Sequence, residues 1–426
     1  MKILRISHVF YREAVNDKIK NWDLINKSTD DMLENIFKLK IHYSNSISVE
    51  LNKFGYEIFE SIYDVELLQK KWAYENDIQY DKSNWEEEII IAQIKKIKPD
   101  ILFFQHFPPF SIQTWKSLRE ICPSIKIIMM HMAWIGESPV IPDVDILLVG
   151  TKSLVDRYKK EKLNPYLMYH YFDESVHNCC EKESTENYYP VTFLGSSGYG
   201  YGPLHASRYW LLDALLKNDL LEAWLWEKKE VDTNQKQKNS IGRYFFEGIL
   251  GAFPQRLLKS ISKNLMVPTK IRNLSNAQIE KLEYINQGLE IPPNPLSKKY
   301  PTKCHDPLFG IDFYKVIGST KISLQKHGHT KQVEIGAMRL FQVTGMGSLM
   351  MTDYGLGLED LFVPGDEVVV FDNHEDAIRK IKYYLSHETE RQKIAKAGQA
   401  KTLQKHTARN RAEMINDLII ERMRFK

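Results

Sequence analysis

The chain has 426 residues, a hydrophobic fraction of 43% and a formal net charge of +3. This length is too great for one compact core, so we expect two domains. The charge is too small to indicate a nucleic-acid-binding protein, and no apolar run reaches the ~18 residues that would predict a membrane-spanning helix.

The start of the chain and its cysteines favour a reducing compartment. Met1 and Lys2 lead directly into the apolar segment "ILRISHVF", without the layout of a signal peptide. The cysteines form neither a CxxC motif nor a Cys/His ligand set; they are Cys122, Cys179, Cys180 and Cys304. We therefore expect a cytoplasmic protein with free thiols and no bound metal.

Short apolar runs alternate with helical patterns over residues 1–172, the expected first domain. Strands are expected at Lys2–Ser7, Tyr56–Tyr63, Asp100–Gln105, Lys126–His131 and Asp145–Gly150. Helices are expected at Asp31–Phe54, Trp85–Lys98, Ser111–Ile121 and Ser153–Lys160. Apolar strands separated by helices are typical of a parallel sheet that is covered on both faces.

The polar segment "DESVHNCCEKESTENYYP", residues 173–190, is the expected linker to a second α/β domain at 191–405. Its strands are expected at Val191–Leu194, Glu222–Trp226, Lys321–Leu324, Ser348–Thr352 and Glu367–Phe371, and its first helix at His205–Leu216. Helices are expected from Glu375 onward, with a break around Gly398–Thr407. Residues 406–426 are expected to pack back on the first domain. The sequence thus predicts two Rossmann-like, doubly wound α/β domains that face a central cleft.

The most glycine-rich loop of the chain is "FLGSSGYGYG", Phe193–Gly202, between a predicted strand and a predicted helix. Glycines let backbone N–H groups approach a phosphate, and the start of a helix adds positive potential. His205 and Arg208 follow one helical turn apart, so both could face the same anion. The alternative is that the glycines only form a flexible turn.

A second candidate is the segment "EIGAMRLFQVTGMGSLMMTDYGLGLEDLF", which begins at Glu334. If Glu334–Val343 is helical, Glu334 and Gln342 lie on similar faces two turns apart. A carboxylate and an amide so placed could hold hydroxyl groups of a sugar and a ribose. The alternative is a surface helix with two ordinary polar residues.

Histidines are expected at the carboxyl ends of three strands, facing the cleft: His106, His131 and His327. A single histidine is more often structural. Because histidines recur at equivalent positions here, we weigh the functional and the structural interpretation equally. No Asp-x-Asp pair lies at a strand end, so the sequence does not suggest a diphosphate bridged by a metal.

Several segments resemble a known family. Residues Met338–Arg411, which begin "MRLFQVTGMGSLMMTDYGLGLEDLF", resemble the C-terminal part of GT-B glycosyltransferases, closest to the CgeB-like, spore-maturation-type family. The segments "HDPLFGIDFYKVIGSTKISLQKHG" and "KPDILFFQ" are also similar. The resemblance covers most of the chain apart from part of residues 228–302, where a helical insert is expected. It implies the GT-B fold and glycosyl transfer.

The resemblance also implies site residues. Retaining GT-B enzymes place two acids with seven residues between them, one near the donor sugar and one on the ribose. Glu334 matches the first acid, and Gln342 replaces the second with an amide that forms weaker, neutral hydrogen bonds. The remaining implied contacts are Gly195, Ser196, Arg208 and Arg339 to the donor diphosphate; His131 to the donor sugar; and Asp353 and Glu359 to the nucleotide or sugar. From their positions in the sequence, His205 is expected to join the diphosphate contacts, His327 the nucleotide or sugar contacts, and His106 the acceptor side.

The implied reaction moves a sugar from a nucleotide sugar to a glycan, a lipid-linked acceptor or a protein. Anomeric retention is expected, with no cofactor and no essential metal. Two alternatives stay open: a degenerate sugar-binding or scaffold subunit, which Gln342 favours, and a nucleotide-sugar epimerase of the same fold.

The expected insert carries ten Lys/Arg and three Asp/Glu between Lys228 and Arg272. A basic amphipathic element can lie on an anionic membrane surface, which would place the protein at the inner face of the cell membrane. The alternative is a helical pair packed on the second domain with a solvated basic face.

Overall fold

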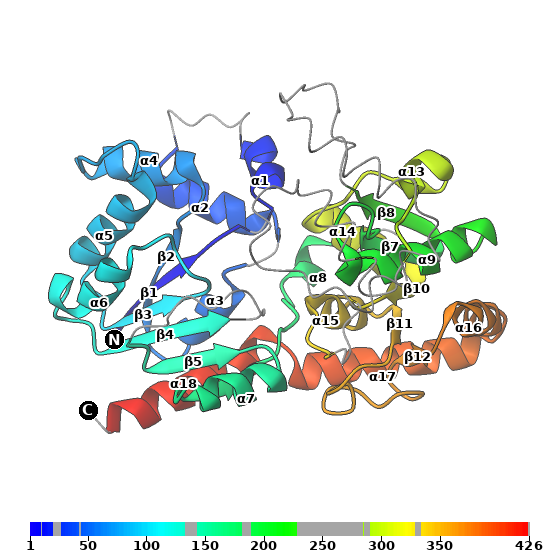
Figure 1. Cartoon of the computed structure of the whole chain (residues 1–426). Coiled ribbons are helices and arrows are strands. Elements are labelled where there is room, and N and C mark those ends of the chain that lie inside the picture. The colour runs from blue at the N-terminus through cyan, green and yellow to red at the C-terminus, as the bar shows by residue number, and fades with distance from the viewer. Residues whose placement is uncertain are drawn as a thin grey trace, which may run out of the picture.

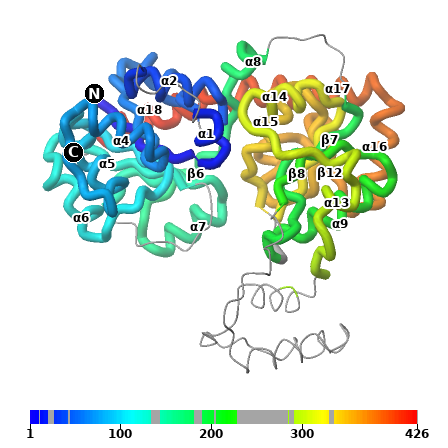
Figure 2. The backbone as a smooth tube through the Cα atoms, turned by 90° about the horizontal axis from the view of Figure 1, so that it is seen from above, coloured from blue at the N-terminus to red at the C-terminus, as the bar shows by residue number. Residues whose placement is uncertain are grey.

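The computed structural model describes residues 1–9, 11–19, 27–41, 44–132, 143–180, 189–227, 284, 290–328 and 334–424. Two six-stranded parallel sheets, each flanked by helices, form two halves of the molecule (Figure 1). Figure 2, seen from above, shows these halves side by side with α8 between them. This arrangement confirms the predicted α/β fold of two doubly wound domains. Most of the expected insert, 228–302, lies outside the described residues.

The first sheet has the strand order β2-β1-β3-β4-β5-β6. Its strands are β1 (Lys2–Ser7), β2 (Glu57–Ile62), β3 (Ile101–Phe104), β4 (Ile127–Met132), β5 (Ile146–Val149) and β6 (Pro165–Leu167). Alternate residues of each strand pack on opposite faces, so Leu4 and Ile3 belong to different apolar clusters. Burial on both faces explains why the strands read as continuous apolar runs. The short strand β6 was not predicted.

The helices of this half are α1 (Arg12–Ile19), α2 (Thr29–Lys38), α3 (Ser46–Asn52), α4 (Glu66–Glu75), α5 (Trp85–Ile97), α6 (Ile112–Ile121) and α7 (Lys152–Lys160). The prediction of one helix over Asp31–Phe54 is wrong, because two shorter helices occupy that range. Ser28 and Asp31 form a capping box that begins α2. Lys40 then adopts a positive φ of 56°, which a continuing right-handed helix does not allow.

The second sheet has the order β12-β11-β10-β7-β8-β9. Its strands are β7 (Tyr189–Ser196), β8 (Glu222–Trp226), β9 (Cys304–His305), β10 (Thr320–Gln325), β11 (Leu349–Asp353) and β12 (Val369–Phe371). The flanking helices are α9 (Pro203–Lys217), α13 (Leu296–Lys299), α14 (Ile311–Gly318), α15 (Met338–Gly345), α16 (His374–Ser386) and α17 (Glu388–Lys405). The five predicted strands are confirmed within two residues at each end, and β9 was not predicted.

In the part of the chain that the structure describes, two crossings connect the halves, and they lie against each other. The first precedes α8 (Val176–Cys179), and the second precedes α18 (Ala408–Arg424). At the contact, the backbone N–H of Phe172 donates to the carbonyl of His406 at 2.8 Å. Helix α18 then packs with Ile415 and Ile419 on the first sheet (Figure 1). The exact limits predicted for the domains and the linker stay a prediction.

Candidate functional site

Both sheets reverse their strand order at a single point. In the second sheet the reversal lies between β7 and β10, and in the first it lies between β1 and β3. Open α/β sheets bind ligands outside the carboxyl ends of their strands at such a switch point. The loops that follow these four strands therefore form the candidate site.

The loop after β7 folds tightly onto the first turn of α9. Gly198 has a φ of +91°, and a Cβ atom on it would lie only 2.2 Å from the carbonyl oxygen of His205. A Cβ atom on Gly195 would lie 3.9 Å from Nη2 of Arg339. The hydroxyl of Ser196 accepts a hydrogen bond from the N–H of Gly198 at 3.2 Å. The glycines thus bring the backbone next to a guanidinium group.

Arg339, on α15, is a cation whose charge is only partly compensated. Its guanidinium carbon lies 4.1 Å from the ring centre of Phe313. Its Nη1 is buried and has no hydrogen-bond partner among the described residues. Burial lowers the pKa of Arg339, and Tyr11 and Tyr314 oppose that effect. A buried charge without a hydrogen-bonded partner is costly, so this geometry suits a bound anion.

Two residues of α9, the cation Arg208 and the neutral His205, lie at the same edge. Arg208 donates from Nε to the carbonyl oxygen of Lys326 at 2.6 Å. Burial lowers the pKa of Arg208, while the carboxylate of Asp353 raises it. His205 has a buried Nδ1 for which the described part of the chain offers no partner. Burial and Arg208 lower the pKa of His205 to about 4, so this ring is neutral near pH 7.

Asp353, the last residue of β11, fixes the loop after β10. Its carboxylate accepts from the backbone N–H of His327 at 2.9 Å, from Nδ1 of the same ring at 2.8 Å and from Nζ of Lys326 at 2.8 Å. Burial would raise the pKa of Asp353, but these donors hold it well below its usual range. Nε2 of His327 is buried without a partner in the described ranges. The contact of Nδ1 with Asp353 thus fixes the orientation of the ring.

The structure brings together most of the residues predicted for the second domain. They share the carboxyl edge of β7, β10 and β11 and the adjoining helices: Gly195, Ser196, His205, Arg208, His327, Arg339 and Asp353. Glu359, in contrast, is exposed in a turn and accepts from the Tyr354 hydroxyl at 2.8 Å. Residues 357–361 form turns and a bend.

Glu334 and Gln342 do not lie on one helix face, so that prediction is wrong. Helix α15 begins only at Met338, because the N–H of Ile335 pairs with the carbonyl of Leu356 at 2.9 Å and holds the preceding residues extended. Gln342 instead donates from Nε2 to the hydroxyl of Tyr314 at 3.1 Å.

Glu334 contacts the other half of the molecule. Its carboxylate accepts from the backbone N–H of Ser153 at 2.8 Å and also from the Ser153 hydroxyl, in the first turn of α7. A carboxylate at this place is favourable because it satisfies an unpaired N–H and faces the positive end of the helix. Glu334 therefore lies at the boundary between the two domains.

The two histidines predicted in the first domain have different environments. His106 is exposed after β3, and its ring centre lies 4.4 Å from that of His8 after β1. His131 is 3% exposed in β4, 6.1 Å from the ring of His170. Burial lowers the pKa of His131 to about 3. His106 thus reaches the surface, whereas His131 is a buried neutral side chain.

Sequence reasoning missed Tyr11, which follows β1 at the switch point of the first sheet. Its ring centre lies 5.1 Å from that of Trp226 and 4.7 Å from that of Phe309, both in the second domain. Burial raises the pKa of Tyr11, and Arg339 and Arg208 act against that increase, so Tyr11 lies within electrostatic reach of the cluster. A single tyrosine in "HVFYRE" carries no pattern that could have indicated this contact.

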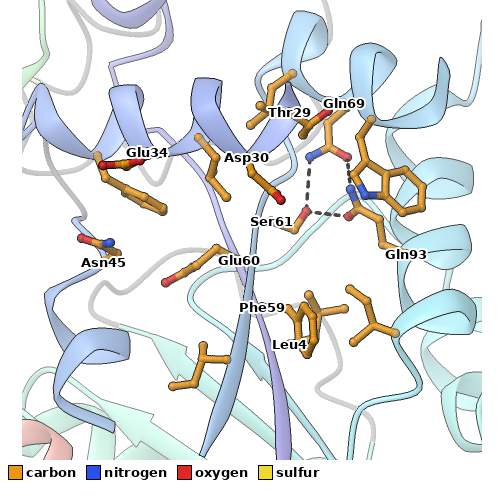
Figure 3. A pocket seen from close by; sticks show the side chains of 16 residues that line it. Leu4, Thr29, Asp30, Glu34, Asn45, Phe59, Glu60, Ser61, Gln69 and Gln93 are labelled. Carbon is orange, nitrogen blue, oxygen red and sulfur yellow. Dashed lines mark hydrogen bonds between the residues drawn. The ribbon is translucent and has the colours of Figure 1, made fainter. Parts of the chain in front are cut away.

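A separate pocket of about 380 Å³ lies in the first domain between α2, α4, α5 and the edge strand β2 (Figure 3). Among the described residues, its lining includes three carboxylates and no Lys, Arg or His: Asp30, Glu34 and Glu60. The side chains of Ser61, Gln69 and Gln93 hydrogen-bond to one another. This acidic lining would repel a diphosphate, so the arginine-bearing edge of the second sheet is the better candidate.

Comparisons with known proteins bear on the family and the fold. Residues 278–417 match the family model described as "Glycosyl transferase-like", whereas no curated protein matches the chain. Anabaena HepE, solved with UDP and glucose, is 11% identical over 99% of this chain and 100% of its own, with a TM-score of 0.52. Sucrose-phosphate synthase from Thermosynechococcus elongatus is 7% identical over all of both chains, also at 0.52.

A glycosyltransferase from Rickettsia africae is 12% identical over 99% of this chain and 98% of its own, with a TM-score of 0.51. At such low identity these likenesses show the fold alone. The chain therefore has the two-domain GT-B fold, and its C-terminal part matches the glycosyl transferase-like family.

Proposed function

We propose that the protein transfers a sugar from a nucleoside-diphosphate sugar to an acceptor, at the edge formed by β7, β10 and β11. The observation that carries this proposal is the buried Arg339 Nη1, which lacks a partner among the described residues and lies beside the glycine loop. Arg208 and the unpartnered ring nitrogens of His205 and His327 belong to the same edge. A diphosphate would supply the negative charge and the hydrogen-bond acceptors that the two guanidinium groups need.

The proposed chemistry is stabilisation of a leaving group. Negative charge develops on the diphosphate as the bond to the sugar breaks. Backbone N–H groups of the glycine loop, the start of α9 and the two guanidinium groups would stabilise that charge without reorganisation. Because two arginines can neutralise the diphosphate, the proposal requires no metal ion.

Glu334 and Gln342 concern the stereochemistry of the proposed reaction and whether the protein turns over its donor. Retention of configuration and membership of the CgeB-like group rest on sequence resemblance, with Glu334 beside the donor sugar. Its position at the domain boundary suits a group that meets the donor when the domains close. Gln342 points to Tyr314, which favours the second candidate: a subunit that binds a sugar nucleotide but does not turn it over.

The acceptor and the membrane contact are also proposals. No helix among the described residues has the length and apolar character needed to cross a bilayer. A glycan, a lipid-linked acceptor or a protein remains the proposed acceptor class, and the basic segment 228–272 is the proposed contact with anionic lipid. Sedimentation with anionic liposomes, compared with a variant carrying Gln at its Lys/Arg positions, tests that contact; equal, negligible binding would refute it.

Release of nucleoside diphosphate from a panel of UDP, GDP, CDP and dTDP sugars tests the proposed reaction. The assay is run with and without glycan acceptors, and again with EDTA. Acceptor-dependent release that persists in EDTA is the expected result. Conversion of the donor sugar without acceptor would indicate an epimerase, and binding without any turnover would indicate the sugar-binding subunit.

A further inference from the structure

We propose that Tyr11 completes the diphosphate site from the opposite domain, with its hydroxyl donating a hydrogen bond to the bound diphosphate. This inference rests on the proposed function and adds a residue of the first domain to a site built in the second. Through Tyr11, the first domain would contact the same ligand that the second domain binds.

The position of Tyr11 follows from the ends of two strands. Tyr11 comes four residues after the end of β1, at the switch point of the first sheet. It packs on Trp226, the last residue of β8, which lies opposite Ser196 in the strand register. The carbonyl of Trp226 also accepts from the N–H of Ser197 at 3.3 Å. The Tyr11 ring therefore contacts the residue whose backbone pairs with the start of the glycine loop.

A second contact fixes the ring from the other side. Phe309 packs on Tyr11 and on Trp226, with ring centres 4.7 Å and 5.5 Å apart. The next residue, Gly310, has a φ of +62°, and a Cβ atom on it would lie 2.0 Å from the carbonyl oxygen of Leu39. This turn of the second domain therefore contacts the first domain directly. Tyr11 lies at this contact between the domains.

The charges around the phenol suit a hydrogen bond to an anion. Burial raises the pKa of Tyr11, and although Arg339 and Arg208 lower it, the net change is upward. The phenol thus keeps its proton at neutral pH and can donate. A diphosphate held by the two guanidinium groups would offer an acceptor to that O–H, and hydrogen bonds to charged groups are stronger than neutral ones.

The test compares Tyr11→Phe with wild type by isothermal titration. Phenylalanine keeps the ring that packs on Trp226 and Phe309 and removes only the hydroxyl. Tyr74→Phe is the matched control, since Tyr74 is in the same domain and is 80% exposed. The probes are whichever of UDP, GDP, CDP or dTDP the wild type binds best, together with its nucleoside. Tyr11→Phe is expected to bind the diphosphate roughly 10-fold or more weakly and the nucleoside equally well.

Each other outcome overturns the proposal in a recognisable way. Unchanged affinity for the diphosphate would show that the hydroxyl makes no contact. Tighter binding would show that Tyr11 obstructs the site, and an equal loss for diphosphate and nucleoside would show a packing role only. If wild type binds no nucleoside diphosphate, the proposed function falls as well, which distinguishes the two failures.

Discussion

The buried charge of Arg339 is expected to lower the stability of the free protein and to favour binding of an anion. Its guanidinium is stacked on Phe313, and Nη1 is buried without a partner among the described residues. The desolvation of a charged group is then not recovered within the protein. Such a residue is expected where a ligand supplies the missing interactions, because sites of this kind commonly cost stability in the free protein.

Arg339→Met is therefore expected to change ligand affinity and protein stability in different ways. Its affinity for a nucleoside diphosphate should fall by roughly 10-fold or more, because a charge-assisted contact is lost. Its melting temperature should stay equal or rise, because the buried charge is removed. Arg379→Met is the control on an exposed arginine of the same domain. A lower melting temperature with unchanged affinity would mean that Arg339 is structural.

His131 gives the fold a dependence on pH. Its pKa is lowered to about 3 by burial, from an ordinary value of 6.5. Between these values the unfolded chain binds a proton that the folded chain does not, so the free energy of unfolding falls as the pH falls below 6.5. The slope is at most about 1.4 kcal/mol per pH unit for one group.

His131→Gln should flatten that slope. Denaturant titrations between about pH 7 and pH 5 should show a smaller loss of stability for His131→Gln than for wild type. His387→Gln, at an exposed position, should follow wild type. Equal slopes for all three proteins would contradict the assignment of a buried neutral imidazole.

At the scale of elements, the site depends on how the loop after β7 enters α9. Gly198 allows this loop to fold onto the first turn of the helix, with no space for a Cβ atom beside the His205 carbonyl. Gly198→Ala must displace the loop, so diphosphate affinity should fall by roughly 10-fold or more and stability by about 2 kcal/mol.

Gly55→Ala is the matched control for that change. Gly55 also has a positive φ, +85°, but nothing lies within 4 Å of the added Cβ atom. It should lose stability through backbone strain alone and keep diphosphate affinity. If both variants bind alike, the glycine loop does not shape the site.

Elements also show where sequence reasoning succeeds. The strands and the loops at their carboxyl ends follow from apolar runs and strand order, so the cluster around Arg208, His327 and Asp353 could be predicted. The extended backbone at Glu334 could not be predicted, because it depends on the pairing of Ile335 with Leu356 and on the contact of Glu334 with α7 in the other domain. Tyr11 was missed for the same physical reason: contacts between domains leave no local periodicity in the sequence.

At the scale of the whole molecule, Arg411 ties together the two chain crossings. It donates to the carbonyl oxygens of Tyr169 at 2.8 Å, His170 at 2.9 Å and Lys405 at 3.2 Å. Arg411→Leu would leave these carbonyls without their donor. The free energy of unfolding is therefore expected to fall by about 2–4 kcal/mol. Calorimetry should show the two domains unfolding less cooperatively.

Arg409→Leu is the control for that experiment. Arg409 lies on the same helix, and its side chain is 71% exposed and pairs with Glu413. It should unfold like wild type, since exposed ion pairs contribute little. Equal behaviour of the two variants would show that Arg411 does not couple the domains.

The most direct test of the account is hydrogen–deuterium exchange of the wild-type protein with and without the nucleoside diphosphate that it binds best. Slower exchange is expected in the backbone of the loops after β7 and β10 and in the first turn of α9. Protection confined to the helices around the acidic pocket near Asp30, or no protection anywhere at saturating ligand, would contradict a diphosphate site at the edge formed by β7, β10 and β11.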